Sequence, residues 1–172
     1  MSKFIGYFLD HWLGWALVSS ALMLAIAHAF ETFGGYAPCT LCLHQRTVYW
    51  AAGAIALAGM ALTSRGDLQR FRWAFNIALA LTFAIGMGVA IYHSGAEWKW
   101  WPGPTTCASS GGRVDLSALA AISNGTAKIK PPACDVAAWR LFGISMAGYN
   151  VLISLKLTVL SLMAASNRRS FS

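Results

Sequence analysis

Charged residues are scarce in this chain of 172 residues. They make up 11% of it, whereas a soluble domain carries about 25%. The net charge of +7 would suit a nucleic-acid partner, but no basic run is longer than the pair Arg168–Arg169. Basic residues scattered between apolar blocks are typical of the ends of membrane helices, not of a surface that follows a phosphate backbone. The scarcity of charge therefore argues for a membrane protein and against nucleic-acid binding.

Hydrophobic residues make up 57% of the chain and give it a mean hydropathy of +0.54. They gather in four blocks that are uncharged or, in the fourth, interrupted only by Lys156. A bilayer is crossed by about 20 consecutive apolar residues. The sequence thus predicts an all-α membrane protein, a four-transmembrane-helix bundle forming a single domain over 1–172. The predicted spans are approximately 12–30, 46–64, 72–92 and 141–164.

The short loop at 64–72 is basic, and positive charge in short loops is retained in the cytoplasm. This predicts cytoplasmic N- and C-termini, with the loops 31–45 and 93–140 on the opposite, periplasmic side. A short apolar stretch at 114–122 predicts a helix lying on the membrane surface. The Ala27-His28-Ala29 stretch resembles a signal-peptidase site, but cleavage there would leave the remaining orientation unchanged.

The four cysteines fall on this one predicted face, at Cys39, Cys42, Cys107 and Cys134. The first two form a Cys-X-X-Cys motif, which is typical of redox centres with shifted thiol pKa values. Four cysteines also suit structural zinc, but the second pair lacks the close spacing that zinc sites use. Two inert disulfides, or one structural and one redox pair, remain alternatives. We predict two redox-active pairs and no metal.

Arg46 lies four positions after Cys42, about one helical turn along the predicted second span. A cation there favours a thiolate and can donate hydrogen bonds to an anionic oxygen on an electron acceptor. The chain lacks flavin, haem-attachment and iron–sulfur motifs, so a lipid-soluble quinone is the simplest acceptor for a dithiol at the bilayer edge.

These residues resemble a known family. The Pro-Cys-Thr-Leu-Cys-Leu-His-Gln-Arg stretch at 38–46, the four spans and the second cysteine pair are similar to the disulfide bond formation protein B (DsbB) family. The stretches 101–107 and 132–135, leading into Trp139-Arg140, look like members from Gram-negative bacteria. The resemblance covers essentially the whole chain. It implies a multi-pass protein of the bacterial inner membrane that reoxidises a periplasmic thiol oxidase, DsbA, of thioredoxin fold.

The resemblance also implies residue roles. Cys107–Cys134 would be the disulfide that accepts electrons from the partner, with Cys107 the sulfur attacked. Cys39–Cys42 would reoxidise that pair. Cys42, as a thiolate, would face a bound quinone, with ubiquinone favoured over menaquinone.

Arg46 would hold a ring oxygen of the quinone, and His93 is expected near it. Glu31 and Glu97 are expected to be solvated loop acids. Two other functions remain open: a membrane structural protein with inert disulfides, and a reductase like the vitamin K epoxide reductase family.

Overall fold

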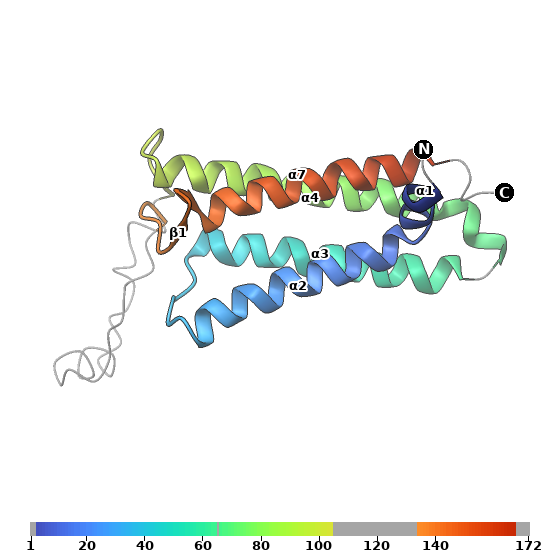
Figure 1. The fold of residues 1–172 in the computed structure, drawn as a ribbon, viewed down its shortest axis with the longest axis horizontal. Helices are drawn as coiled ribbons and strands as arrows, with labels where there is room; N and C mark the ends of the chain where they lie inside the picture. The colour runs from blue at the N-terminus through green and yellow to red at the C-terminus, as the bar shows by residue number, and fades with distance from the viewer. Residues whose placement is uncertain (1–2, 65, 105–133, 168–172) are drawn as a thin grey trace.

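The computed structural model describes residues 3–64, 66–104 and 134–167 (Figure 1). Cys107 and the predicted surface helix at 114–122 lie outside these residues. The described chain is mostly helical. Its long helices are α2 (Trp12–Thr32), α3 (Thr40–Thr63), α4 (Arg72–Glu97) and α7 (Met146–Ser166). Its short elements are α1 (Lys3–Asp10), η1 (Gly66–Phe71), β1 (Arg140–Leu141) and β2 (Ile144–Ser145).

Three helical segments are long and apolar enough to cross a membrane, namely Trp12–Thr32, Leu68–Glu97 and Met146–Ser166. The helix α3 has 24 residues, but it is not among the three. This helix begins at Thr40, before the predicted start of the second span at 46. Its first turns therefore include the polar stretch 44–47. A fourth span thus stays a prediction, although the helix expected there is present.

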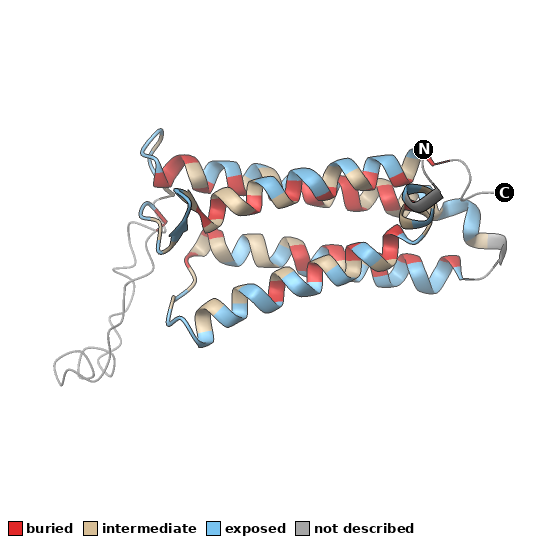
Figure 2. Cartoon of the chain, viewed as in Figure 1, coloured by how far each residue is buried: buried red, intermediate tan, exposed pale blue. Residues whose placement is uncertain are grey.

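The long helices pack side by side, with α4 along α7, α2 along α3, and α3 against α4 (Figure 1). Buried residues lie where the helices face one another, and exposed ones lie on the outside (Figure 2). The core includes Trp12, Leu13, Tyr49, Leu79, Phe83 and Leu157. Large apolar side chains also cover the outer faces, among them Trp50, Leu81, Ile85, Leu152 and Val159. An apolar exterior of this extent suits lipid better than water.

The helix α7 begins at Met146, whereas the sequence predicted a span from 141. Residues 140–145 instead form a small antiparallel hairpin in which Arg140 pairs with Ser145 and Leu141 with Ile144. Phe142 and Gly143 make its turn with φ of 51° and 81°, as a two-residue turn with both φ positive requires. The Ser145 side chain then accepts the Gly148 N–H and caps α7. Hydropathy did not reveal this turn because its flanking residues are apolar.

The two ends of the bundle differ. At one end the Asn167 side chain donates to the Asp10 carboxylate over 2.9 Å, which joins α1 to the end of α7 near η1 (Figure 1). At the other end, the start of α3, the end of α4 and the β1–β2 hairpin come together (Figure 1). The described cysteines lie at this second end.

Candidate functional site: a dithiol beside an apolar cavity

The Cys39–Cys42 pair sits at the start of α3. Cys39 is the N-cap residue, with extended backbone, and its Sγ accepts the Cys42 N–H over 3.3 Å. Serine, threonine or aspartate usually fills this position, because an oxygen there satisfies a free helical N–H. A sulfur in the same place lies at the positive end of the helix dipole, which favours a thiolate.

The two sulfurs of this pair lie 2.7 Å apart as free thiols. The two thiols are hydrogen-bonded to each other, and His93 Nε2 is within hydrogen-bond distance of the Cys39 sulfur. These contacts outweigh burial and lower the pKa of Cys39 to about 4. The reduced pair therefore carries one negative charge at neutral pH, centred on Cys39.

Cys134 reaches the same place from the far end of the long loop. Its side chain is fully buried and packs with Cys39 and Leu41, with Cys42 and Val89 alongside. Cys134 is disulfide-bonded. Cys107, the partner that the resemblance implies, lies outside the described residues. The arrangement brings one cysteine of the loop into contact with the Cys-X-X-Cys pair.

The position of Cys134 is held from outside by a charged pair. Lys99, just past the end of α4, donates to the carboxylate of Asp135 over 2.6 Å. This hydrogen bond and the lysine charge lower the pKa of Asp135. The pair is exposed to solvent, so it contributes little to stability. Its effect is to fasten the residue after Cys134 to the end of α4.

His93 lies on α4 against the dithiol. It is 5% exposed; its Nε2 is 3.8 Å from Cys39 Sγ, and its Nδ1 is 3.1 Å from the Gln45 amide nitrogen. Glu97, one turn later, is buried as well, with its Oε1 3.7 Å from His93 Nε2. The expectation that Glu97 is a solvated loop acid is wrong, because α4 continues past the predicted span and buries it.

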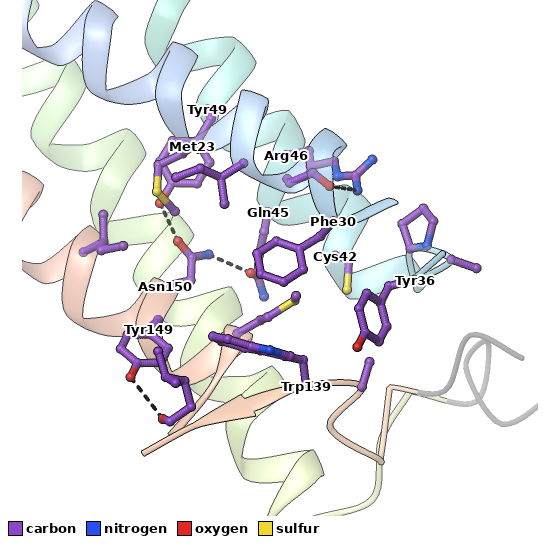
Figure 3. A pocket seen from close by; sticks show the side chains of 18 residues that line it. Met23, Phe30, Tyr36, Cys42, Gln45, Arg46, Tyr49, Trp139, Tyr149 and Asn150 are labelled. Atoms are coloured by element: carbon purple, nitrogen blue, oxygen red, sulfur yellow. Dashed lines mark hydrogen bonds between the residues drawn. The ribbon is translucent and has the colours of Figure 1, made fainter. Parts of the chain in front are cut away.

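A cavity of about 350 Å³ adjoins the other cysteine (Figure 3). Cys42 and Arg46 lie on its wall, and Phe30, Tyr36 and Trp139 gather beside them (Figure 3). Further lining residues include Met23, Ile26, Gln45, Tyr49, Leu141, Met146, Tyr149, Asn150 and Ile153. The volume falls in the range of small-molecule sites, and the mostly apolar wall with a few polar groups is typical of them. His93 is not among the residues that line it.

Arg46 is fixed by α2. Its Nη1 lies 2.5 Å from the Glu31 carboxylate, and its Nη2 donates to the Ala27 carbonyl over 3.1 Å. The expectation that Glu31 is a solvated loop acid is wrong about the loop, because Glu31 lies in α2 and pairs with Arg46, although its side chain is still 38% exposed. A guanidinium has five N–H donors, so these bonds leave others for a ligand in the cavity. Arg46 also acts electrostatically on the Cys42 sulfur.

Three ligand atoms, from Cys39, Cys42 and His93, lie within 4.8 Å of one another. A structural zinc site has four ligands, and the part of the chain that the structure describes supplies three here. The hydrogen bonds of the reduced pair account for the same distances, so we do not assign a metal to these residues.

Comparison with known families decides what this arrangement belongs to. The model of the family described as "Disulfide bond formation protein DsbB" matches residues 10–164. The chain belongs to the DsbB family. The resemblance seen in the sequence is confirmed, and with it a multi-pass membrane protein with thiol oxidoreductase activity.

Two relatives carry the name "Disulfide bond formation protein B". The protein from Dechloromonas aromatica (strain RCB) is 28% identical over 137 residues, which cover 76% of each chain. The protein from Methylobacillus flagellatus is 25% identical over 173 residues, covering 96% of this chain and 94% of its own. No solved structure gives a significant match.

In this DsbB-family chain a group of polar side chains, buried or half-buried, lies below the dithiol and was not predicted from the sequence. Gln45, Tyr49, Asn150 and Ser154 are joined by hydrogen bonds between α3 and α7. Polar residues inside apolar spans are costly and tend to face the bundle interior. That rule marks each of them as noteworthy, but their meeting depends on which helix faces pack together.

Proposed function

We propose that this DsbB-family protein is a thiol:quinone oxidoreductase of the bacterial inner membrane. It would reoxidise a periplasmic DsbA-like oxidase of thioredoxin fold and so support disulfide formation in secreted proteins. The observation that carries the proposal is the position of the Cys39–Cys42 pair. Cys134 packs against Cys39, and the cavity opens beside Cys42.

Electrons would enter through the loop disulfide Cys107–Cys134. The partner's thiolate attacks Cys107, a mixed disulfide forms, and the partner's second thiol resolves it, leaving Cys107 and Cys134 reduced. The Cys134 thiolate then attacks Cys39, which breaks the Cys39–Cys42 bond. Cys107 attacks Cys134 in turn, restoring the loop disulfide and releasing Cys39 as a thiolate.

The geometry favours this order of attack. Cys134 and Cys39 belong to one small buried cluster, which supports attack by Cys134 on Cys39. When Cys39 is bonded to Cys134, Cys42 is the free sulfur of the pair and lies beside the Arg46 charge. Cys42 is then the thiolate that faces the cavity, as the family resemblance implies.

The residues around the cavity fit a quinone. Aromatic and aliphatic side chains provide a wall for a flat ring, and Arg46 supplies free N–H donors for a ring oxygen. A bound quinone would take up two electrons and two protons, the amount released when two thiols become one disulfide. Ubiquinone is the quinone we propose, and His93 would act on the dithiol through Cys39.

The membrane arrangement belongs to the same proposal. We place α3 as a fourth span beside the three apolar segments, because it packs lengthwise between α2 and α4. Four spans would put both termini on one side of the membrane, and the basic loop at 64–72 favours the cytoplasm for that side, with the cysteines on the periplasmic side. An oxidising periplasm is where such disulfides persist.

The test is a quinone-reduction assay with the purified full-length protein, a reduced DsbA-like partner and ubiquinone, followed by absorbance. We expect partner thiols to disappear as quinone is reduced, and Cys42→Ser to abolish this. Arg46→Ala should raise the KM for quinone about tenfold or more, since hydrogen bonds to charged groups are worth about 1.5–3 kcal/mol. Arg70→Ala is the matched control, because Arg70 is exposed on η1 at the opposite end of the bundle.

A parallel assay with menaquinone separates the choice of quinone from the reaction itself. Turnover with menaquinone but not with ubiquinone would overturn the choice of ubiquinone and leave the oxidoreductase proposal standing. No electron transfer with either quinone would overturn the oxidoreductase proposal and favour a structural protein with inert disulfides.

A further inference from the structure

A chain of hydrogen bonds runs from the middle of the bundle to the dithiol, through α3, α7 and α4. The Tyr49 hydroxyl donates to the Asn150 side-chain oxygen. The Asn150 amide donates to the Gln45 oxygen over 2.6 Å. The Gln45 nitrogen lies 3.1 Å from His93 Nδ1, and His93 Nε2 lies 3.8 Å from Cys39 Sγ. Figure 3 shows Tyr49, Asn150 and Gln45 joined in this order.

The direction of the chain is set at its dithiol end. His93 Nε2 faces two acceptors, the Cys39 sulfur and Oε1 of Glu97. A neutral imidazole carries one N–H and one bare nitrogen, so a donor at Nε2 leaves Nδ1 as an acceptor. The Gln45 group facing Nδ1 must then be its amide N–H, and its oxygen faces Asn150.

The other end agrees with this direction. The Asn150 oxygen receives the Tyr49 hydroxyl and a second hydroxyl, from Ser154, over 3.4 Å. This leaves the Asn150 amide N–H to face Gln45. Every donor thus points the same way, from two hydroxyls toward the sulfur. Hydrogen bonds aligned in this way polarise one another, which strengthens the last donor.

We propose that Gln45 and Asn150 are positioning residues that hold His93 in the tautomer with its proton on Nε2, so that it always presents a donor to Cys39. The inference deepens the proposed function, in which Cys39 leaves as a thiolate when the loop disulfide is restored. It assigns a role to two residues that touch neither the partner nor the reacting sulfurs. His93 is thereby kept from presenting an unprotonated nitrogen to the Cys39 thiolate.

The surroundings of His93 and Glu97 supply the remaining charges. Arg140, on β1, acts electrostatically on the Glu97 carboxyl, and the Ser145 hydroxyl hydrogen-bonds to it. The second carboxyl oxygen, Oε2, has no partner among the described residues. None of these groups contacts Nδ1, so Gln45 restrains that nitrogen, while the Cys39 sulfur and the Glu97 carboxyl face Nε2.

The decisive variant is Asn150→Asp. A carboxylate can only accept, so Gln45 would turn its N–H toward it and its oxygen toward His93. The imidazole proton would then move to Nδ1, and Nε2 would cease to donate to Cys39. Gln45→Met removes the same restraint without adding charge. Asn76→Asp is the matched control, because Asn76 is equally buried in α4 but takes no part in this series of hydrogen bonds.

Two measurements on full-length protein in detergent test this, in a background carrying Cys107→Ser and Cys134→Ser so that only the Cys39–Cys42 thiols remain. Nitrogen NMR of protein isotope-labelled at histidine reads the tautomer, with His93 assigned by its loss in His93→Asn. We expect the Nε2–H form in the wild-type pair and in Asn76→Asp, and its loss in Asn150→Asp and Gln45→Met.

Ultraviolet thiolate absorbance of the reduced pair gives the second reading. With the donor lost, the pH at which half of the thiolate absorbance disappears should rise by about one unit, the effect of one hydrogen bond to a charged group. Finding Nδ1–H in the wild-type pair, or Nε2–H unchanged in both variants, overturns the inference. Neither measurement uses quinone or partner, so a failure of the proposed function would be seen separately.

Discussion

Arg46 lies 2.5 Å from the carboxylate of Glu31, so the cation proposed to bind quinone is oriented by an acid on the neighbouring helix. This contact predicts an effect for a residue with no chemistry of its own. Glu31→Gln should raise the KM for quinone by about fivefold or less, because a part-exposed ion pair contributes roughly 1 kcal/mol or less. The kcat should stay near that of the wild type.

The matched control for this steady-state assay is Asp10→Asn, which removes a carboxylate at the far end of the bundle. A tenfold fall in kcat in Glu31→Gln with KM unchanged would mean that Glu31 serves the reaction and not the orientation of Arg46.

The lowered pKa of Cys39 predicts a pH dependence for the reduced pair. The pKa falls from an ordinary value of about 8.5 to about 4, mainly through the Cys42 hydrogen bond. The corresponding stabilisation of the reduced fold is complete above the ordinary value and is lost as pH falls through about 4. One thiolate should therefore persist in ultraviolet absorbance from pH 8 to about pH 5 in protein lacking Cys107 and Cys134.

A pair that loses this absorbance near neutral pH would contradict the assignment of the charge to Cys39. The assignment has a further consequence for the redox potential. Stabilising the thiolate stabilises the reduced form, which makes the Cys39–Cys42 disulfide a stronger oxidant.

The contact between Cys134 and Cys39 predicts which mixed disulfide can be trapped. In protein carrying Cys42→Ser and Cys107→Ser, the two remaining cysteines should join on mild oxidation, because they share one buried cluster. Mass spectrometry of peptides identifies the bond. Protein carrying Cys39→Ser and Cys107→Ser is the matched comparison, and its Cys42–Cys134 bond should form more slowly. Equal rates would show that the cluster does not select the attacked sulfur.

The sequence was a good guide to the helices and a poor one to their ends. Hydropathy located every long helix, because apolar blocks of that length have few other uses in a chain so poor in charge. It stopped α4 at 92, whereas the helix runs to Glu97 and takes that acid into the interior. The same effect in α2 carries Glu31 to Arg46. Hydropathy assigns a carboxylate at a helix end to the loop, because the partner that holds it on another helix is not visible in the sequence.

The Cys39–Cys42 pair and Arg46 were predicted because a redox motif of this kind is defined by short spacings along the sequence. Cys-X-X-Cys is visible within four residues. The series of hydrogen bonds from Tyr49 to His93 was not predicted. Its members lie on three helices, and the partners on different helices are about 50 or more residues apart in sequence. Asn150 and Gln45 meet only through the packing of α3 and α7 at this end of the bundle. The pattern of residues along a single helix does not predict this contact between α3 and α7.

The packing of α3 on α4 predicts a difference between two glycines on one helix. A Cβ on Gly86 would lie 2.8 Å from a methyl carbon of Val48, whereas one on Gly88 would meet nothing within 4 Å. Gly86→Leu should thus push α3 away and destabilise the bundle by about 1–3 kcal/mol, as overpacking does in protein cores. Gly88→Leu adds the same side chain without that contact and should leave stability near that of the wild type. Unfolding of the purified protein in mixed micelles of rising denaturing-detergent content measures both. Equal losses would mean that these helices do not pack through Gly86, and the placement of the dithiol relative to His93 would fall with that packing.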